Sequence, residues 1–98
     1  MSAAEEREPR IRLRLQVRGL VQGVGFRPFV RRLAARHALS GHVRNETAGV
    51  VIEVEGAPEP AARFQEELRL HAPPLAVVAE VRAEPLPARG DRDFRILP

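Results

Sequence analysis

The sequence has 98 residues, a size that favours one domain with a single small core. Apolar residues make up 44% and charged residues 30%, which excludes a disordered chain, and no apolar run approaches the ~20 residues of a membrane-spanning helix. Cysteine is absent, which excludes disulfides and thiolate chemistry, and all 16 basic residues are arginine, for a net charge of +3.

The chain begins with a charged segment that contains no apolar stretch. We predict a flexible tail over residues 1–9 and one domain over residues 10–98. The segment does not resemble a secretory signal, so a cytoplasmic location is expected. From Arg10 onward polar and apolar residues alternate, which predicts a half-buried strand. Its polar face is formed by Arg12, Arg14, Gln16 and Arg18.

A glycine-rich segment follows this strand. Glycine stands at positions 19, 23 and 25, which predicts a loop over 19–25. Pro28 suits the first turn of a helix, and Phe29, Val30 and Leu33 then recur on one helical face. Gly41 is expected to end this helix.

The second half of the sequence predicts a hairpin, a helix and two strands. A short strand over 42–45 and an alternating segment over 50–55 flank a turn over 46–49. Pro60 is expected to begin the second helix, and Pro73 with Pro74 to end it. Alternation over 77–82 predicts a fourth strand, followed by a loop over 85–91. Phe94 and Ile96 indicate a short last strand.

The order of these elements predicts the fold class. Strand, helix, strand, strand, helix and strand in succession are typical of an α+β, ferredoxin-like split βαβ sandwich. An antiparallel sheet would then carry two helices on one face, with the first strand between the third and fourth. The other face would be open to solvent.

The excess of basic over acidic residues suggests two classes of partner, nucleic acid and a small anionic substrate. RNA readers with this plan stack bases on aromatic side chains of the open face. The outward residues of the first strand include no aromatic, and Glu53, Glu55 and Glu80 stand on its neighbours. This pattern predicts a solvated ladder of opposite charges, with neither nucleic acid nor membrane as a partner.

The glycine loop is a candidate phosphate cradle. It leads from a strand into a helix, where free backbone N–H groups and the helix dipole favour an anion. Arg27 at the helix entry can add a forked pair of donors. The loop lacks GK[ST], and Pro28 stands where a dinucleotide fingerprint needs its third glycine. Spacing alone leaves a second interpretation open, a tight turn with an exposed arginine.

Asn45 is the second candidate. It shares strand parity with Val43 and should face the helices at the end of its strand. A neutral amide there can orient a water molecule, although asparagine also favours hairpin turns. The three histidines form no metal-binding pattern, so neither a metal nor a cofactor is predicted.

Several segments together resemble the acylphosphatase family. These are VQGVGFRPFV (21–30), GHVRN (41–45), GVVIEVEG (49–56), Phe64, the two prolines at 73–74 and the closing Phe94-Arg95-Ile96. The resemblance covers about residues 11–97. More narrowly, Gly25 and the Pro28-Phe29-Val30 run are similar to the N-terminal domain of the hydrogenase maturation carbamoyltransferases of HypF type.

The resemblance implies roles for particular residues. Arg27 would bind the phosphoryl group, and Asn45 would hold the attacking water. The backbone amides of the loop would cradle the same phosphoryl group, at Gln22, Gly23, Val24, Gly25 and Phe26. His42 stands where the family usually has a tryptophan, a departure that affects packing more than chemistry.

The function implied is hydrolysis of an acyl phosphate, with carbamoyl phosphate as the expected substrate, by an enzyme that uses no cofactor. Phosphoryl transfer of this kind needs mainly positioning and charge stabilisation. Two alternatives stay open. The chain could bind or channel an acyl phosphate for the other domains of a larger carbamoyltransferase without turnover, or it could be a free-standing acylphosphatase.

Overall fold

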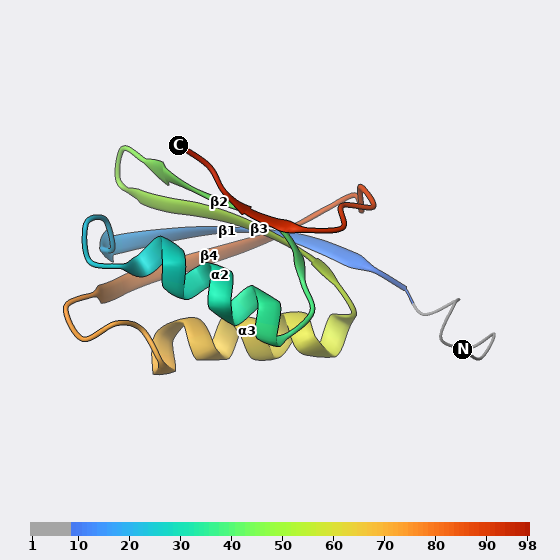
Figure 1. Ribbon diagram of the computed structural model, residues 1–98, viewed down its shortest axis with the longest axis horizontal. Coiled ribbons are helices and arrows are strands. Elements are labelled where there is room, and N and C mark those ends of the chain that lie inside the picture. The colour runs from blue at the N-terminus through green and yellow to red at the C-terminus, as the bar shows by residue number, and fades with distance from the viewer. Residues whose placement is uncertain (1–8) are drawn as a thin grey trace.

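The computed structural model describes residues 9–98 and contains a five-stranded sheet with two helices packed on one face (Figure 1). The predicted tail lies outside the described residues, except for the exposed Pro9. No helix in the described part of the chain combines the length and apolar content needed to cross a bilayer. The elements are β1 (Ile11–Leu20), α2 (Phe26–Arg36), β2 (Ser40–Glu46), β3 (Gly49–Gly56), α3 (Pro58–Leu70), β4 (Val77–Leu86) and β5 (Phe94–Ile96).

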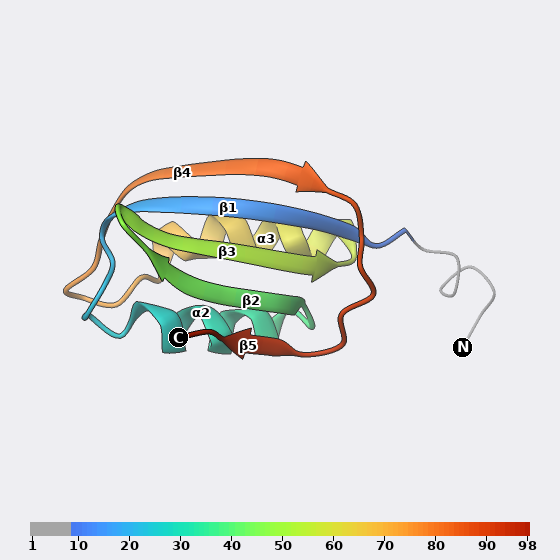
Figure 2. The same ribbon diagram turned by 90° about the horizontal axis from the view of Figure 1, so that it is seen from above.

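The strands lie in the order β4-β1-β3-β2-β5 across the sheet (Figure 2). β1 pairs antiparallel with both β3 and β4, and β2 pairs antiparallel with β3. β5 lies at the edge and runs parallel to β2. The central position of β1 and the two helices on one face confirm the predicted ferredoxin-like α+β fold.

The core lies between the sheet and the helices. Leu15 and Val17 of β1 are buried on this face, as the alternation predicts. Phe64 and Leu68 of α3 are fully buried, and each such side chain stabilises the fold by about 1.5–3 kcal/mol. Helix α2 contributes the predicted apolar residues Phe29, Val30 and Leu33, together with Ala34 and with Phe26 at its first position.

Helix α2 ends differently from the prediction. Gly41 lies in β2, and the helix ends in a Schellman motif centred on Ala38, which has φ +53°. The Leu39 N–H donates to the carbonyl of Ala34 at 2.9 Å, and the Ala38 N–H donates to that of Ala35 at 3.1 Å. The motif was missed because alanine, without glycine's freedom, takes the left-handed position.

The other boundaries differ by a few residues. Helix α2 begins at Phe26, so Pro28 still falls in the first turn, where a missing N–H costs nothing. Helix α3 begins at Pro58 and ends at Leu70, before the paired prolines. The predicted loop over 85–91 is wrong at its start, because Pro85 and Leu86 belong to β4. A proline is tolerated there because β4 is an edge strand.

The open face of the sheet corrects another prediction. Arg12, Glu53 and Glu55 were expected in a solvated ladder, but their exposed fractions are 1%, 7% and 0%. The connection between β4 and β5 crosses this end of the sheet on the side away from the helices (Figures 1 and 2). Local sequence could not reveal this cover, because it comes from residues 79 positions after Arg12 and 34 to 35 positions after Glu55. Arg18, at the other end, is exposed as predicted, and Glu80 is half-buried.

Candidate active site

The glycine loop between β1 and α2 contains two left-handed residues. Gly23 has φ +72° and Gly25 has φ +78°, whereas Val24 between them has a negative φ. An added Cβ would meet no atom within 4 Å at either glycine, so the backbone conformation, and not lack of space, requires glycine. When left-handed and right-handed residues alternate in this way, successive backbone N–H groups point into the same concave space.

The backbone donors of this loop are unused. Within residues 9–98, no protein acceptor is found for the N–H groups of residues 23–27. Gly25 is the N-cap residue of α2, so part of this run consists of the free N–H groups of the first helical turn. The helix dipole adds about half a positive charge at the same end. The loop therefore offers an electropositive set of N–H donors.

The side chain of Gln22 ties this loop to the β2–β3 hairpin. Its Nε2 donates to the carbonyl oxygens of Glu46 and Gly49, the latter at 2.7 Å. Sequence reasoning assigned Gln22 only a backbone amide in the cradle. The side-chain contacts place the loop beside the end of β2.

Asn45 lies next to Glu46 in β2. Its cross-strand partner is Val50, a buried core residue, so Asn45 shares the helix-facing side of the sheet, as parity predicted. The residue is exposed because it stands at the end of the strand. The hairpin turn is formed by Thr47 and Ala48, so Asn45 is not itself a turn residue.

Arg27 is half-buried in the first turn of α2. Its Nη1 donates to the main-chain carbonyl of Leu97 at 3.0 Å. The Leu97 N–H in turn donates to the carbonyl of Val43 at 2.8 Å, two residues before Asn45. Leu97 therefore brings the guanidinium of Arg27 to the end of β2 that carries Asn45. Nothing in the sequence signals this contact, since a main-chain carbonyl supplies it.

Comparison with known proteins identifies the family. The sequence model of the acylphosphatase family matches residues 13–96, nearly the whole chain. The chain belongs to the acylphosphatase family. Its enzymes are hydrolases that act on acyl phosphates, and this confirms both the predicted resemblance and the predicted enzyme class.

The relatives are of two kinds. An acylphosphatase of Caldivirga maquilingensis is 44% identical over 86% of this chain and 87% of its own length. The carbamoyltransferase HypF2 of Cupriavidus necator is 53% identical over 93% of this chain but only 12% of its own length. The crystal structure of full-length HypF in a phosphate- and nucleotide-bound form matches with a TM-score of 0.89 and 34% identity, over 92% of this chain and 12% of that one.

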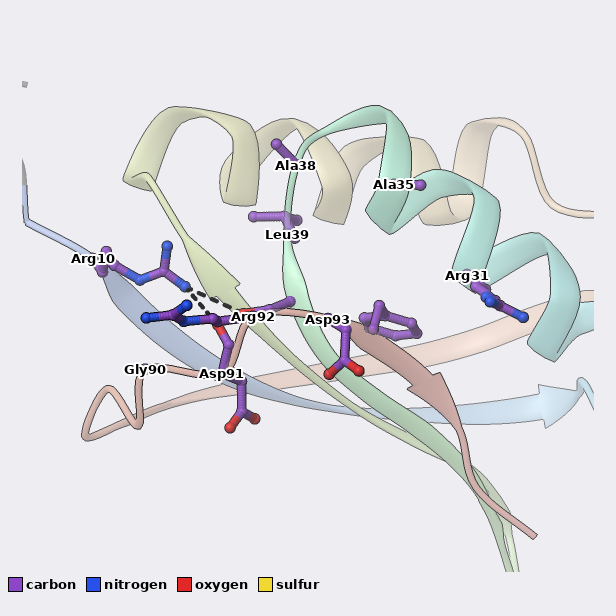
Figure 3. Close-up of a pocket in the computed structure, with 11 residues that line it drawn as sticks. Arg10, Arg31, Ala35, Ala38, Leu39, Gly90, Asp91, Arg92 and Asp93 are labelled. Atoms are coloured by element: carbon purple, nitrogen blue, oxygen red, sulfur yellow. Dashed lines mark hydrogen bonds between the residues drawn. The ribbon is translucent and has the colours of Figure 1, made fainter. Parts of the chain in front are cut away.

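This acylphosphatase domain also has a cavity of about 750 Å³ beside α2 (Figure 3), and no residue of the glycine loop lines it. It is bounded by Arg31 and Ala35 of α2 and by the chain around Asp91 and Phe94. Neither Arg27 nor Asn45 lines it. The loop therefore remains the candidate site, because a phosphoryl group is small and converging N–H donors of this kind suit it.

Histidines and acidic residues form no metal centre in the described part of the chain. No group of three or more such side chains converges within residues 9–98. His37 ends helix α2 and contacts Glu67 of α3, and His71 ends α3. His42 lies half-buried on the open face, 3.7 Å from Glu53. His37 and His42 therefore each lie beside a glutamate, and His71 lies exposed at the end of α3.

Proposed function

We propose that this chain hydrolyses the mixed anhydride of an acyl phosphate, releasing a carboxylate and inorganic phosphate. The observation that carries the proposal is the run of unused N–H groups over residues 23–27, with Arg27 at its end. A phosphoryl group carries its charge on oxygens, and such oxygens bind well to backbone N–H groups and to a guanidinium. The family membership supports the same reaction class.

Arg27 and the loop amides stabilise the charge in this proposal. The phosphoryl oxygens accept hydrogen bonds from the loop and from the N–H groups of Arg27 that do not face Leu97. The donors are fixed before substrate arrives, because Gln22 holds the loop and Leu97 holds the guanidinium. Fixed donors need no reorganisation as charge develops in the transition state.

Asn45 positions the water. Its neutral amide adds little to anion affinity, but it can hold a water in line with the bond that breaks. The water oxygen forms the new bond to phosphorus, and the acyl oxygen leaves with the bonding electron pair as a carboxylate. The proton of the water passes to solvent. Because the anhydride is already activated, orientation of the water is the main contribution required.

Carbamoyl phosphate is the substrate we propose. The support is the similarity to relatives named as carbamoyltransferases, HypF2 of Cupriavidus necator among them. Hydrolysis would yield carbamate and phosphate. The proposal includes a role as one module of hydrogenase maturation, and a cytoplasmic location remains a prediction from the sequence.

A second candidate is a binding or channelling domain that does not turn over. The chain spans about 12% of the carbamoyltransferases that it resembles, and in such a protein the domain could deliver an acyl phosphate to another site. Against this stands the similarity to a free-standing acylphosphatase over 87% of that protein's length, which favours independent catalysis.

One assay separates these candidates. Phosphate release is measured for the 98-residue chain with carbamoyl phosphate, acetyl phosphate and benzoyl phosphate, and Arg27→Ala serves as control. Turnover that is lost in Arg27→Ala supports the hydrolase. Phosphate binding by calorimetry without turnover on any of the three substrates would support the binding domain instead.

A further inference from the structure

We propose that Arg12, Glu55 and Asp91 are positioning residues for Arg27. They form a charge cluster, with Arg12 and Glu55 buried and Asp91 partly exposed, at the end of the open sheet face far from the glycine loop. Through β5 they hold the carbonyl that receives the Arg27 guanidinium. This inference rests on the proposed function, in which Arg27 binds the phosphoryl group. It adds a second region, remote from the loop, to the residues that determine its geometry.

The cluster is built around the Arg12 side chain, which has no exposed surface. Its Nη1 donates to Glu55 Oε1 and to Asp91 Oδ2, both at 3.0 Å, and its Nε donates to Glu53 at 2.9 Å. A buried guanidinium needs such partners, because removing it from water costs several kcal/mol. The cluster therefore imposes a single geometry on the groups around it.

Glu55 attaches the β4–β5 connection to the sheet. Its carboxylate, also without exposed surface, accepts the backbone N–H groups of Arg89 at 2.7 Å and Gly90 at 2.8 Å. Figure 3 shows Arg10 reaching the same segment, where its Nη2 donates to the carbonyl of Asp91 at 3.2 Å. Residues 87–93 form no helix or strand, so these contacts replace regular pairing.

The anchored segment leads directly into β5. The carbonyl of Asp93 accepts the N–H of Gly41 at 2.8 Å, which begins the pairing with β2. β5 has only three residues and pairs on one side only. The N–H of Leu97 makes the last contact with β2, and its carbonyl faces Arg27. The position set at Asp91 is therefore transmitted to Leu97 through a short segment in which only Phe94–Ile96 form a strand.

Such a short edge strand is expected to fray when its entry is not fixed. The position of the Arg27 guanidinium, at the other end of this segment, must be accurate, because a misplacement of about 1 Å can lower the reaction rate by about 10²-fold. The charge cluster around Arg12 fixes the entry of β5 and so prevents this fraying. It thus acts on Arg27 without touching the phosphoryl group.

The test compares Asp91→Ala with Glu84→Ala in the full 98-residue chain. Glu84 is the matched control, because it also pairs with an arginine of β1, Arg14, on the same face, but its carboxylate is exposed and, within residues 9–98, bonds neither Arg12 nor the β4–β5 connection. The readouts are the NMR resonance of the Arg27 Nε–Hε group, the hydrogen exchange of the Leu97 amide, and the affinity for inorganic phosphate. The first two require no ligand.

We expect Asp91→Ala to shift the Arg27 resonance, to speed exchange at Leu97 and to weaken phosphate binding by about 2- to 30-fold, the usual range for remote coupling. Asp91→Asn, which keeps an acceptor for Arg12, should largely restore all three readouts. Glu84→Ala should match the wild type. Asp91 is partly exposed, so the variants are expected to fold.

The inference is overturned if folded Asp91→Ala behaves as Glu84→Ala in the resonance and the exchange, or if these change while phosphate affinity does not. Glu55→Gln, which weakens the same anchor from the sheet side, gives an independent check and should reproduce the changes of Asp91→Ala. A wild-type chain that binds no phosphate would instead contradict the proposed function, whatever the ligand-free readouts show.

Discussion

The guanidinium of Arg27 donates a hydrogen bond to the carbonyl of Leu97 at 3.0 Å, across 70 positions of sequence. The helix that follows the glycine loop is thereby linked to the last strand of the sheet. The contact uses one N–H of the guanidinium and leaves others directed elsewhere. Arg27 is thus held in one orientation near the end of β2 that carries Asn45.

The fork of Arg27 should matter more than its charge. Arg27→Lys keeps the charge but cannot bind Leu97 and a phosphoryl group at once, so acyl phosphate hydrolysis should fall by about 10²–10³-fold. Steady-state phosphate release measures the effect. Arg31→Lys, one helical turn further along α2 and exposed, is the control and should keep its rate. A near wild-type rate for Arg27→Lys would contradict the assignment.

Asn45 should act on water and not on phosphate. Asn45→Ala should lose turnover by about 10²-fold or more, since positioning can account for several kcal/mol of a barrier. Inorganic phosphate should still bind with similar affinity, because Arg27 and the loop amides remain. Calorimetric titration of Asn45→Ala and Arg27→Ala with inorganic phosphate measures this affinity. A loss of phosphate affinity as large as that of Arg27→Ala would make Asn45 a phosphate ligand and end this division of roles.

Ala38→Gly should stabilise the protein. Ala38 holds φ +53° at the end of α2, a conformation that costs an alanine about 1–2 kcal/mol. Part of the gain is offset by the greater freedom of unfolded glycine, so we expect about 0.5–1 kcal/mol in urea unfolding. Ala35→Gly, inside the same helix, is the matched control and should destabilise by about 1 kcal/mol. An equal loss of stability in Ala38→Gly and Ala35→Gly would contradict a left-handed conformation at Ala38.

Acid should weaken the fold through Glu55. Burial opposes ionisation of this carboxyl, but the N–H groups of Arg89 and Gly90 and the guanidinium of Arg12 outweigh it and lower its pKa from 4.5 to about 2. The unfolded chain then binds the proton more readily, so the stabilisation is complete above pH 5 and is lost as the pH falls toward 2. The full contribution is about 3 kcal/mol, of which about 2 kcal/mol should be lost between pH 7 and pH 3.

Urea unfolding of wild type and Glu55→Gln at both pH values measures this contribution. The comparison with the variant is needed because Glu53 and Glu67 also have lowered pKa values, Glu53 through Arg12 against the opposing effect of burial and Glu67 through its contact with His37. The wild type should lose more stability than Glu55→Gln on acidification. Equal losses would show that Glu55 does not carry the acid sensitivity.

Local sequence patterns were enough to predict the helices and strands and their order along the chain. Alternation in β1 and β3 and the helical spacing of Phe29 and Leu33 are local patterns, and each reports directly on which side chains face the core. The glycine loop, Arg27 and Asn45 could also be predicted as site residues, because the segments that resemble the family run without a break over 21–30 and 41–45. Because Asn45 stands two residues after Val43 in the same strand, the alternation of side chains predicts that both face the helices.

The cover of the open face and the partner that orients Arg27 became visible once the chain was folded. Alternation assigns Arg12 to that face but cannot show that the segment around Asp91 buries it. The carbonyl of Leu97 likewise belongs to a main chain that has no sequence signature. Both contacts join residues 70 or more positions apart, and such pairs form only when the sheet order and the path of the last connection are set. Local periodicity carries no information about either.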